Sequence, residues 1–266
     1  MSPQVLNPSY MAAGRAATHV TPLPGPPQHT SETLALAIPT LREAENLPAL
    51  LDALHSVLAP LEIAYQIIVV DDDSRDGTEE IVSAIAVKDP HVRLLVRKGE
   101  RGLSGAILYG WQHTDAAILG VMDADHQHPP DLLPQLLSAI LAGNDMAIGS
   151  RYIAGGRLGN WNPVRKFLSA AAVWATWPIQ HAGLRAKDPM TGFFLVRREC
   201  IDGVRFQPSG FKLLLEILVR GHLHSVVELP LAFGQRSLGA SKANFKVGWD
   251  YAKLLVRLYA DRFRPV

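Results

Sequence analysis

Short runs of apolar residues alternate along this chain with segments in which apolar residues recur at helical spacing. The short runs predict buried strands at 33–38, 66–70, 91–96, 118–122, 145–149 and 222–230, and one more that ends at Val196. The helical spacing predicts helices at 47–58, 106–113, 131–142, 211–221 and 245–262, one that runs through Ile81 and Ile85, and one that begins at Val164. Strands that alternate with helices of this size predict an α/β fold, in which helices cover both faces of a mostly parallel sheet.

Polar or turn-forming residues follow the apolar part of four of these strands. Pro39 follows the first strand, Asp72 the second, Asp123 the fourth and Arg151 the fifth. In open α/β sheets, ligands bind outside the carboxyl ends of the strands. The topology therefore predicts that these four positions lie along one edge of the sheet and mark the functional site.

Two aspartates stand directly after the strand at 118–122. Asp123 and Asp125 are two positions apart, so in extended geometry their side chains point to the same side, and Gln127 continues the series with a neutral oxygen. Hard oxygen ligands of this kind suit Mg²⁺ or Mn²⁺. The alternative is that the acids only solvate a loop, and that Asp125 or Asp131 caps the next helix.

Three consecutive aspartates, 71–73, end the strand at 66–70. Asp76, with Glu79 three residues later, predicts a capping box at the start of the following helix. Capping does not explain the three acids before it, whose mutual repulsion has to be opposed by donors of a ligand or by basic groups from elsewhere in the fold. After the third strand, glycines 99, 102 and 105 could form a turn that binds a phosphate. A glycine-rich helix start is weak evidence for such a site by itself.

Charged residues in the second half of the chain allow two interpretations each. Arg165 and Lys166 occupy the first turn of the predicted helix that begins at Val164, where cations oppose the helix dipole. They either serve an anion or are ordinary solvated cations. Glu216 stands among leucines in the helix at 211–221, and it is either on an exposed face or a buried acid aimed at the site.

The last 34 residues combine a glycine-containing loop with an amphipathic helix. The loop at 233–244 contains Arg236, Ser241 and Lys242 and could close over a diphosphate. The helix at 245–262 carries a charged stripe of Lys246, Asp250, Lys253, Arg257 and Asp261, and an apolar stripe of Val247, Tyr251, Leu254, Leu255 and Leu258. The apolar stripe predicts packing against the core. Together with Trp174 and Trp177 on the preceding charge-free helix, it could instead rest on a membrane surface.

The composition excludes some classes of partner and of membrane attachment. Lys and Arg number 26 against 25 Asp and Glu, so the chain has no basic field for nucleic acid, and we expect no nucleic-acid partner. The single Cys200 is expected to be a buried structural thiol. Residues 1–30 are rich in proline and lack the apolar core of a signal peptide, so they predict a flexible tail. The charge-free stretch from Phe167 to Leu184 carries several polar residues, and we expect no transmembrane span.

The ordered series of motifs resembles glycosyltransferase family 2 and, within it, the polyprenyl-phosphate (dolichyl-phosphate) mannose synthases, over about residues 34–242. A lone Asp-x-Asp is a weak signal, whereas the ordered series is strong. The family usually has Tyr-Asn where this chain has Leu41-Arg42, and Gly is common where it has Ser104. The motifs that carry the resemblance are Pro39-Thr40-Leu41-Arg42-Glu43-Ala44-Glu45-Asn46-Leu47, Val69-Val70-Asp71-Asp72-Asp73-Ser74, Asp76-Gly77-Thr78, Arg101-Gly102-Leu103, Met122-Asp123-Ala124-Asp125-His126-Gln127-His128-Pro129-Pro130, Ser150-Arg151-Tyr152, Asp188-Pro189-Met190-Thr191-Gly192-Phe193-Phe194 and Ser241-Lys242.

The resemblance implies a GT-A fold with a Rossmann-like sheet and C-terminal amphipathic interface helices. After the flexible tail at 1–30, we expect a catalytic domain at 31–243 and a C-terminal amphipathic helix at 244–266 that is part of the same unit. The expected activity is inverting transfer of mannose from GDP-mannose to a polyprenyl monophosphate of the dolichyl or undecaprenyl type. The enzyme is expected on the cytoplasmic face of the membrane as a peripheral protein, and a separate membrane-anchoring protein stays an open alternative.

The resemblance also implies a role for each matching residue. The catalytic set is Asp123, Asp125, Arg151, Arg165 and Ser169, of which Arg165 and Ser169 receive the lipid phosphate. The metal ligands for Mg²⁺ or Mn²⁺ are Asp123, Asp125 and Gln127. The nucleotide sugar is bound by Pro39, Leu41, Glu43, Val70, Asp72, Asp123, Ala124, Asp125, Gln127, Arg151, Arg236 and Lys242.

The expected chemistry agrees with the residues. A departing diphosphate develops negative charge, which a divalent ion, Arg236 and Lys242 would stabilise. An acceptor phosphate is already anionic near neutral pH, so neither a strong general base nor a Ser or Cys nucleophile is required. Two alternatives remain at this point: the same fold acting on UDP-glucose or another nucleotide sugar, and a non-catalytic protein that binds a nucleotide sugar or a lipid phosphate.

Overall fold

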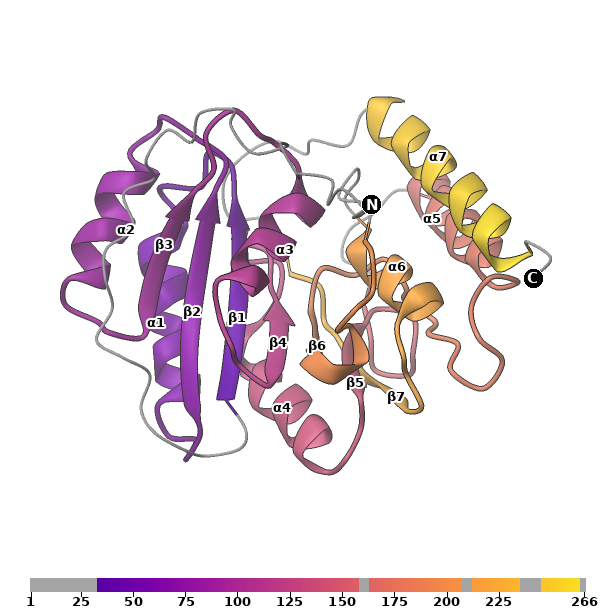
Figure 1. Cartoon of the computed structure of the whole chain (residues 1–266), viewed down its shortest axis with the longest axis horizontal. Helices are drawn as coiled ribbons and strands as arrows, with labels where there is room; N and C mark the ends of the chain where they lie inside the picture. The colour runs from indigo at the N-terminus through magenta and orange to yellow at the C-terminus, as the bar shows by residue number, and fades with distance from the viewer. Residues whose placement is uncertain (1–32, 158–162, 207–211, 235–244, 264–266) are drawn as a thin grey trace, which may run out of the picture.

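The structure is a computed structural model that describes residues 33–157, 163–206, 212–234 and 245–263. The described residues form one seven-stranded sheet with helices packed on it (Figure 1). Its strands are β1 (Thr33–Thr40), β2 (Ala64–Asp71), β3 (Val92–Val96), β4 (Ile118–Val121), β5 (Met146–Ser150), β6 (Phe194–Arg197) and β7 (Val226–Pro230). The predicted α/β class is therefore confirmed.

The strand order across the sheet is β3-β2-β1-β4-β6-β5-β7. Neighbouring strands are parallel except where β6 is involved, because β6 runs antiparallel to both β4 and β5. The mostly parallel sheet is thus as predicted. The reversal of β6 brings the residues that precede this strand to the edge where β4 and β5 end.

The longer helices are α1 (Leu47–Leu58), α2 (Thr78–Ala86), α3 (Leu103–Gln112), α4 (Leu133–Leu141), α5 (Pro163–Thr176), α6 (Leu213–Arg220) and α7 (Phe245–Arg262). Short 3₁₀ turns lie at Pro130–Leu132 and Arg198–Cys200. Helix α3 begins at Leu103, three residues before the predicted start, and α6 begins at Leu213, two residues after it. The predicted capping box places the helix start one residue too early, because Gly77 is the N-cap of α2. Asp76 nevertheless accepts the backbone N–H of Thr78, the first residue of α2, at 3.2 Å.

Alternate residues of β1 belong to two separate cores. Leu34, Leu36 and Ile38 pack with α1, α2 and α4, whereas Ala35 and Ala37 pack with α3 and α6. Successive strand residues point to opposite faces, so this alternation means that both faces of the sheet are covered. Cys200 is buried in the second core, and burial raises the pKa of its thiol to about 12, as expected for a structural thiol.

Helices α5 and α7 lie side by side at one end of the molecule (Figure 1). The Tyr251 hydroxyl donates to the Ala172 carbonyl at 2.6 Å, and the Tyr259 hydroxyl donates to the Ala175 carbonyl at 2.8 Å. Leu254 and Leu258 of α7 are buried against α6. The predicted inward packing of the last helix is therefore confirmed for this stripe.

Glu216 is buried within the junction of α6 and α7. It lies 3.4 Å from Nε of Arg220, and Arg220 also forms an ion pair with Asp261 of α7. The exposed-face interpretation is therefore wrong, and Glu216 is a buried acid that pairs with Arg220. No helix in the described part of the chain has the length and apolar character needed to cross a membrane.

Candidate functional site

The ends of β1, β2, β4 and β5 and the segment before β6 meet at one edge of the sheet. Asp71 ends β2, Asp123 lies two residues after β4, and Arg151 directly follows β5. Because β6 is antiparallel, the segment 188–193 enters β6 from the same edge. The candidate site is built from these segments.

The three consecutive aspartates each have partners within the chain. Asp71 accepts from the Ser74 backbone N–H at 2.8 Å and from the Thr40 hydroxyl at 3.0 Å. Asp73 pairs with Arg75 at 2.8 Å on the surface. The expected opposing groups are therefore found, and they come from the protein itself.

Asp72 is the central member of this cluster and forms a buried ion pair. Its carboxylate lies 2.6 Å from Nη2 of Arg97, and both side chains are 5% exposed. It also accepts the backbone N–H of Gly102 at 2.7 Å. The loop that follows β3 thus supplies the partners of Asp72, which is one of the predicted nucleotide ligands.

The glycines of that loop serve the Asp72–Arg97 pair. Gly102 has a φ of +141°, which favours glycine, and its carbonyl accepts from Arg97 at 3.0 Å. A Cβ at position 105 would lie 2.7 Å from Nη1 of Arg97. Of the three glycines predicted to form a phosphate-cradling turn, Gly105 therefore makes room for the Arg97 guanidinium and Gly102 supplies it with an acceptor.

The residues predicted to line the nucleotide flank the ends of β1 and β2. Pro39 lies opposite Val70 in the parallel register of the two strands. Val70 is fully buried in the core, so its side chain is directed away from any ligand at the edge. Leu41 and Glu43 are half-buried beyond the end of β1, and Glu43 accepts from the Asn46 amide at 2.7 Å.

Asp123 and Asp125 are at the start of a turn. The chain bends at residues 124–126, so the extended geometry predicted for the pair does not continue to Asp125. Strand β4 ends at Val121, and His126 has a φ of +59°. Asp125 is 6% exposed and accepts from the Gln127 backbone N–H at 3.2 Å. The Gln127 amide Nε2 donates to the carbonyl of Gly234 at 3.3 Å, which leaves its Oε1 as the oxygen that a cation could use. Ala124 is buried in the core between the two acids.

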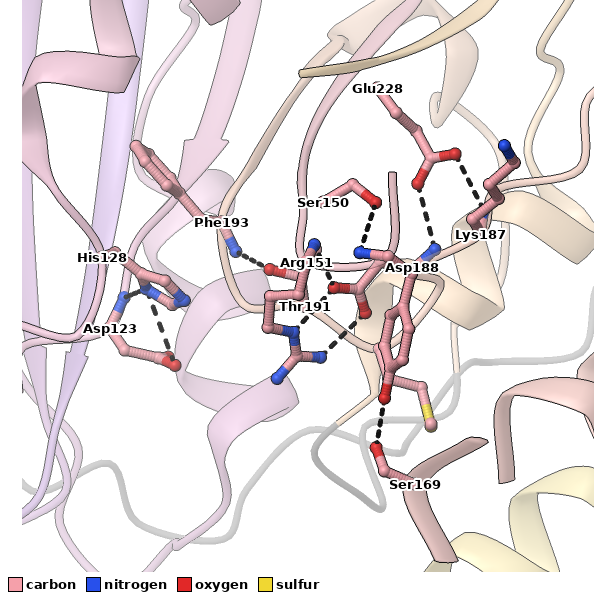
Figure 2. Close-up of polar contacts among 12 residues, drawn as sticks. Asp123, His128, Ser150, Arg151, Ser169, Lys187, Asp188, Thr191, Phe193 and Glu228 are labelled. Carbon is pink, nitrogen blue, oxygen red and sulfur yellow. Dashed lines mark hydrogen bonds and ion pairs between the residues drawn. The ribbon is translucent and has the colours of Figure 1, made fainter. Parts of the chain in front are cut away.

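His128 fixes the start of this turn. Its Nδ1 accepts the backbone N–H of Asp123 at 3.3 Å, so the ring proton of the neutral form lies on Nε2 (Figure 2). The ring lies between Phe193 and Phe233, at centroid distances of 5.3 and 5.5 Å. Burial lowers the pKa of His128 from its ordinary value to about 4, which keeps the ring neutral.

Gly192 lies against the carboxylate of Asp123. A Cβ at position 192 would lie 2.6 Å from Oδ2 and 2.9 Å from Oδ1 of Asp123. The segment before β6 therefore lies so close to Asp123 that only a glycine fits at position 192 without a shift. The next residue, Phe193, donates its backbone N–H to the Thr191 hydroxyl at 3.3 Å.

Arg151 is held by a fully buried aspartate. The Asp188 carboxylate accepts from the backbone N–H of Arg151 at 3.0 Å, from Nε at 2.7 Å and from Nη2 at 2.8 Å (Figure 2). Burial lowers the pKa of Arg151, but the hydrogen bonds and charge of Asp188 outweigh it and raise that pKa above its ordinary value. The guanidinium also lies 5.2 Å from the ring centroid of Phe233.

Ser169 of α5 is tied to the same loop. Its hydroxyl lies 2.7 Å from the phenol oxygen of Tyr152, the residue after Arg151. This contact brings the predicted phosphate contact Ser169 close to the Arg151 loop. Arg165 lies one turn earlier on α5, but its side chain is outside the described part of the chain, as are Arg236 and Lys242.

Lys212 is a cation at this site that the sequence analysis missed. Its ammonium donates to the carbonyl of Met190 at 3.1 Å. Burial, and then the charge of Arg151, lower the pKa of Lys212 to about 8. The sequence offered only a weak signal, a lysine directly before the apolar run of α6.

The residues at the edge fit a hard divalent cation by their donor chemistry. Asp123 and Asp125 supply carboxylate oxygens, which suit Mg²⁺ or Mn²⁺. Within the described ranges, no group of three or more His, Cys, Asp and Glu side chains is arranged to hold a metal ion. A cation at this edge would therefore need further oxygen ligands, such as those of a bound phosphate compound.

Comparison with known proteins identifies relatives over most of the chain. The model of glycosyl transferase family 2 matches residues 35–214. A dolichol-phosphate mannosyltransferase from Pyrococcus furiosus is 41% identical over 85% of this chain and 63% of its own length. A polyprenol monophosphomannose synthase from Mycolicibacterium smegmatis is 35% identical over 89% of this chain and 92% of its own length. This chain thus spans less than two thirds of the first relative and nearly all of the second.

The fold resembles that of solved proteins of low sequence identity. A crystal structure of glucosyl-3-phosphoglycerate synthase from Mycobacterium tuberculosis, in complex with Mn²⁺, UDP and glucosyl-3-phosphoglycerate, has a TM-score of 0.62. It is 17% identical and is matched over 87% of this chain and 80% of its own. At this level of identity the likeness establishes a shared fold.

Proposed function

The chain belongs to glycosyl transferase family 2, and from this premise we propose that it transfers mannose from GDP-mannose to a polyprenyl monophosphate. The observation that carries the proposal is the agreement between the two relatives. They come from different organisms and differ in identity to this chain, yet both are named for joining mannose to the phosphate of a polyprenol-type lipid.

We assign the nucleotide to the ends of β1 and β2 and the diphosphate to the turn after β4. Pro39, Leu41, Glu43 and Val70 would flank the nucleoside, with Val70 contributing through its backbone because its side chain is buried. The buried Asp72–Arg97 ion pair would hold the end of β2 in one conformation. A preorganised edge avoids the cost of ordering flexible groups when the donor binds.

We assign a divalent cation, Mg²⁺ or Mn²⁺, to Asp123, Asp125 and Oε1 of Gln127. When bound, it would neutralise the charge that develops on the departing diphosphate. The assignment is supported by the carboxylate pair at the sheet edge and by the Mn²⁺ and UDP in the solved protein of similar fold. Arg236 and Lys242 are proposed to add positive charge to the same phosphates.

The lipid phosphate is assigned to the Arg151 loop and the start of α5. Arg151, Arg165 and Ser169 would orient it so that a phosphate oxygen attacks the anomeric carbon as the bond from that carbon to the diphosphate oxygen breaks. Attack from the face opposite the leaving group inverts the sugar configuration. Because the phosphate is already anionic, the protein's contribution is positioning and charge stabilisation.

We also propose that α5 and α7 face the membrane that contains the acceptor. Large apolar side chains on and beside these helices are exposed in the described chain: Phe167, Leu168, Trp174, Trp177, Trp249, Val256 and Phe263. Lys166, Lys253 and Arg257 are exposed nearby and would attract anionic lipid. Peripheral binding of the GT-A domain at the cytoplasmic face would bring the lipid phosphate to α5.

The proposed function is tested by sugar transfer from GDP-mannose, UDP-glucose and UDP-galactose to a short polyprenyl phosphate, with Mn²⁺ or with a chelator. We expect a mannosylated lipid from GDP-mannose only, and its loss with the chelator. Asp125→Ala, checked for an unchanged melting temperature, serves as the inactive control. Transfer from a UDP-sugar in preference to GDP-mannose, or full activity of Asp125→Ala, would overturn the donor or the metal assignment respectively.

A further inference from the structure

Glu228 on strand β7 holds two successive backbone amides of the segment before β6. Its Oε2 accepts the N–H of Lys187 at 2.9 Å, and its Oε1 accepts the N–H of Asp188 at 3.0 Å (Figure 2). Glu228 lies opposite Ile148 in the parallel pairing of β5 and β7. One carboxylate therefore anchors this segment to the strand next to β5.

The anchored segment carries the residue that holds Arg151. Asp188 is fully buried and accepts three hydrogen bonds from Arg151. The following Pro189 has no N–H to donate and disfavours helical backbone at Asp188. The backbone N–H of Asp188 donates to Glu228, and the Asp188 carboxylate depends on that backbone for its place.

We propose that Glu228 is a positioning residue of the active site, which acts on the reaction through Asp188 and Arg151. The inference rests on the proposed function, in which Arg151 contacts substrate phosphate. The ordinary role of an acid on an outer strand is to discourage strand pairing with another molecule. Glu228 differs from that role because both of its carboxylate oxygens are engaged by one loop, through charge-assisted hydrogen bonds.

The geometry explains why a small displacement would matter. Asp188 engages Nε and one N–H of Nη2 of Arg151, so the remaining guanidinium N–H groups are directed away from Asp188. Figure 2 shows the guanidinium between Asp188 and Asp123. In the proposed function, the donor and acceptor phosphates would meet at this position. A misplacement of about 1 Å in such a group lowers a rate by up to about 100-fold.

Glu228→Gln is the most direct variant, because it keeps the shape of the side chain but turns one acceptor into an NH₂ group that faces a backbone N–H. We expect kcat for mannose transfer to fall by about tenfold or more, with the KM for GDP-mannose within about twofold of wild type. Glu199→Gln, an exposed acid of the same charge, is the control and should retain wild-type rates. Equal rates for Glu228→Gln and wild type would overturn the proposal.

A double-mutant cycle separates positioning from general stability. In an Arg151→Lys background, the two-point contact with Asp188 is already lost, so Glu228→Gln should lower the rate by much less than it does in the wild type. A merely structural role predicts the same fold loss in both backgrounds, and that result would contradict the proposal.

Amide hydrogen exchange tests the contact of Glu228 with the two amides independently of enzyme activity. The amides of Lys187 and Asp188 should exchange slowly in the wild type and much faster in Glu228→Gln, with the rest of the protein unchanged. Slow amides in a wild type that transfers no mannose would reject the proposed function but keep the anchoring contact. Fast amides in the wild type would reject the anchoring contact itself.

Discussion

The α-carbon of Gly192 faces the carboxylate of Asp123 so closely that an added Cβ would lie 2.6 Å from Oδ2. Real Cβ atoms essentially never approach an oxygen this closely, so one of the two residues would have to move. Asp123 sits in a turn whose backbone is fixed by His128. Gly192 sits in a segment that is held at Asp188 by Glu228 and at Phe194 by pairing with β4. The contact therefore couples the segment before β6 to the proposed metal ligand.

Gly192→Ala should impair the metal-dependent step and leave the fold intact. The displaced Asp123 carboxylate would bind the cation less well, so we expect the Mn²⁺ concentration for half-maximal transfer to rise by about tenfold or more. A metal titration of mannose transfer measures this. Gly248→Ala is the matched control, since a Cβ there meets nothing within 4 Å. An unchanged metal requirement in Gly192→Ala would contradict the coupling.

Arg165→Ala should weaken use of the lipid acceptor more than use of the donor. If Arg165 receives the lipid phosphate, its loss removes a charge-assisted contact, and the KM for polyprenyl phosphate should rise by roughly tenfold. The KM for GDP-mannose should stay within about twofold. Steady-state kinetics with each substrate varied in turn measure both values. Arg205→Ala, an exposed arginine outside the proposed site, is the control. Equal losses toward both substrates would remove the assignment.

Much of the fold follows from local pattern, but the direction of β6 does not. Apolar runs and helical spacing predict the strands and helices of residues 33–150, because both reflect burial of one element at a time. A short run such as 194–197 is equally apolar in either direction. Its reversal is decided by the strands on either side of it, β4 and β5, and by the path of the chain after α5.

The candidate site was predictable in position but not in detail. The carboxyl ends of strands place Asp72, Asp123 and Arg151 at one edge, as the topology requires. The partner of Asp72 is Arg97, and no local spacing pairs residues that far apart. Lys212 and Glu228 enter the site region from later elements, so only the folded chain identifies them.

Asp72→Asn should destabilise the protein. The change leaves Arg97 buried at 5% exposure beside a neutral amide, and breaking a buried ion pair on one side costs about 3–5 kcal/mol. Chemical denaturation should show that loss in the free energy of unfolding. Asp73→Asn, whose partner Arg75 is exposed, should change it by less than about 1 kcal/mol. Similar losses in the two variants would mean that the Asp72–Arg97 pair contributes no more than a surface pair.

His128 should make the metal-free protein sensitive to mild acid. Its pKa is about 6.5 in the unfolded chain and about 4 when buried, so between these values the unfolded state takes up a proton that the native state does not. The contribution of His128 to stability is complete above pH 6.5 and is lost as the pH falls to 4. The two pKa values correspond to a loss of about 3 kcal/mol, because each unit is worth about 1.4 kcal/mol.

Urea unfolding at several pH values, with a chelator present, measures this loss directly. His128→Asn keeps an acceptor near the Asp123 N–H but does not titrate, so its unfolding free energy should fall less between pH 7 and pH 4 than that of the wild type. The comparison concerns the pH dependence, since the smaller side chain lowers stability at every pH through lost packing. His222→Asn, at an exposed position, should keep the wild-type pH dependence. If His128→Asn shows the same pH dependence as the wild type, the buried neutral ring does not govern acid sensitivity.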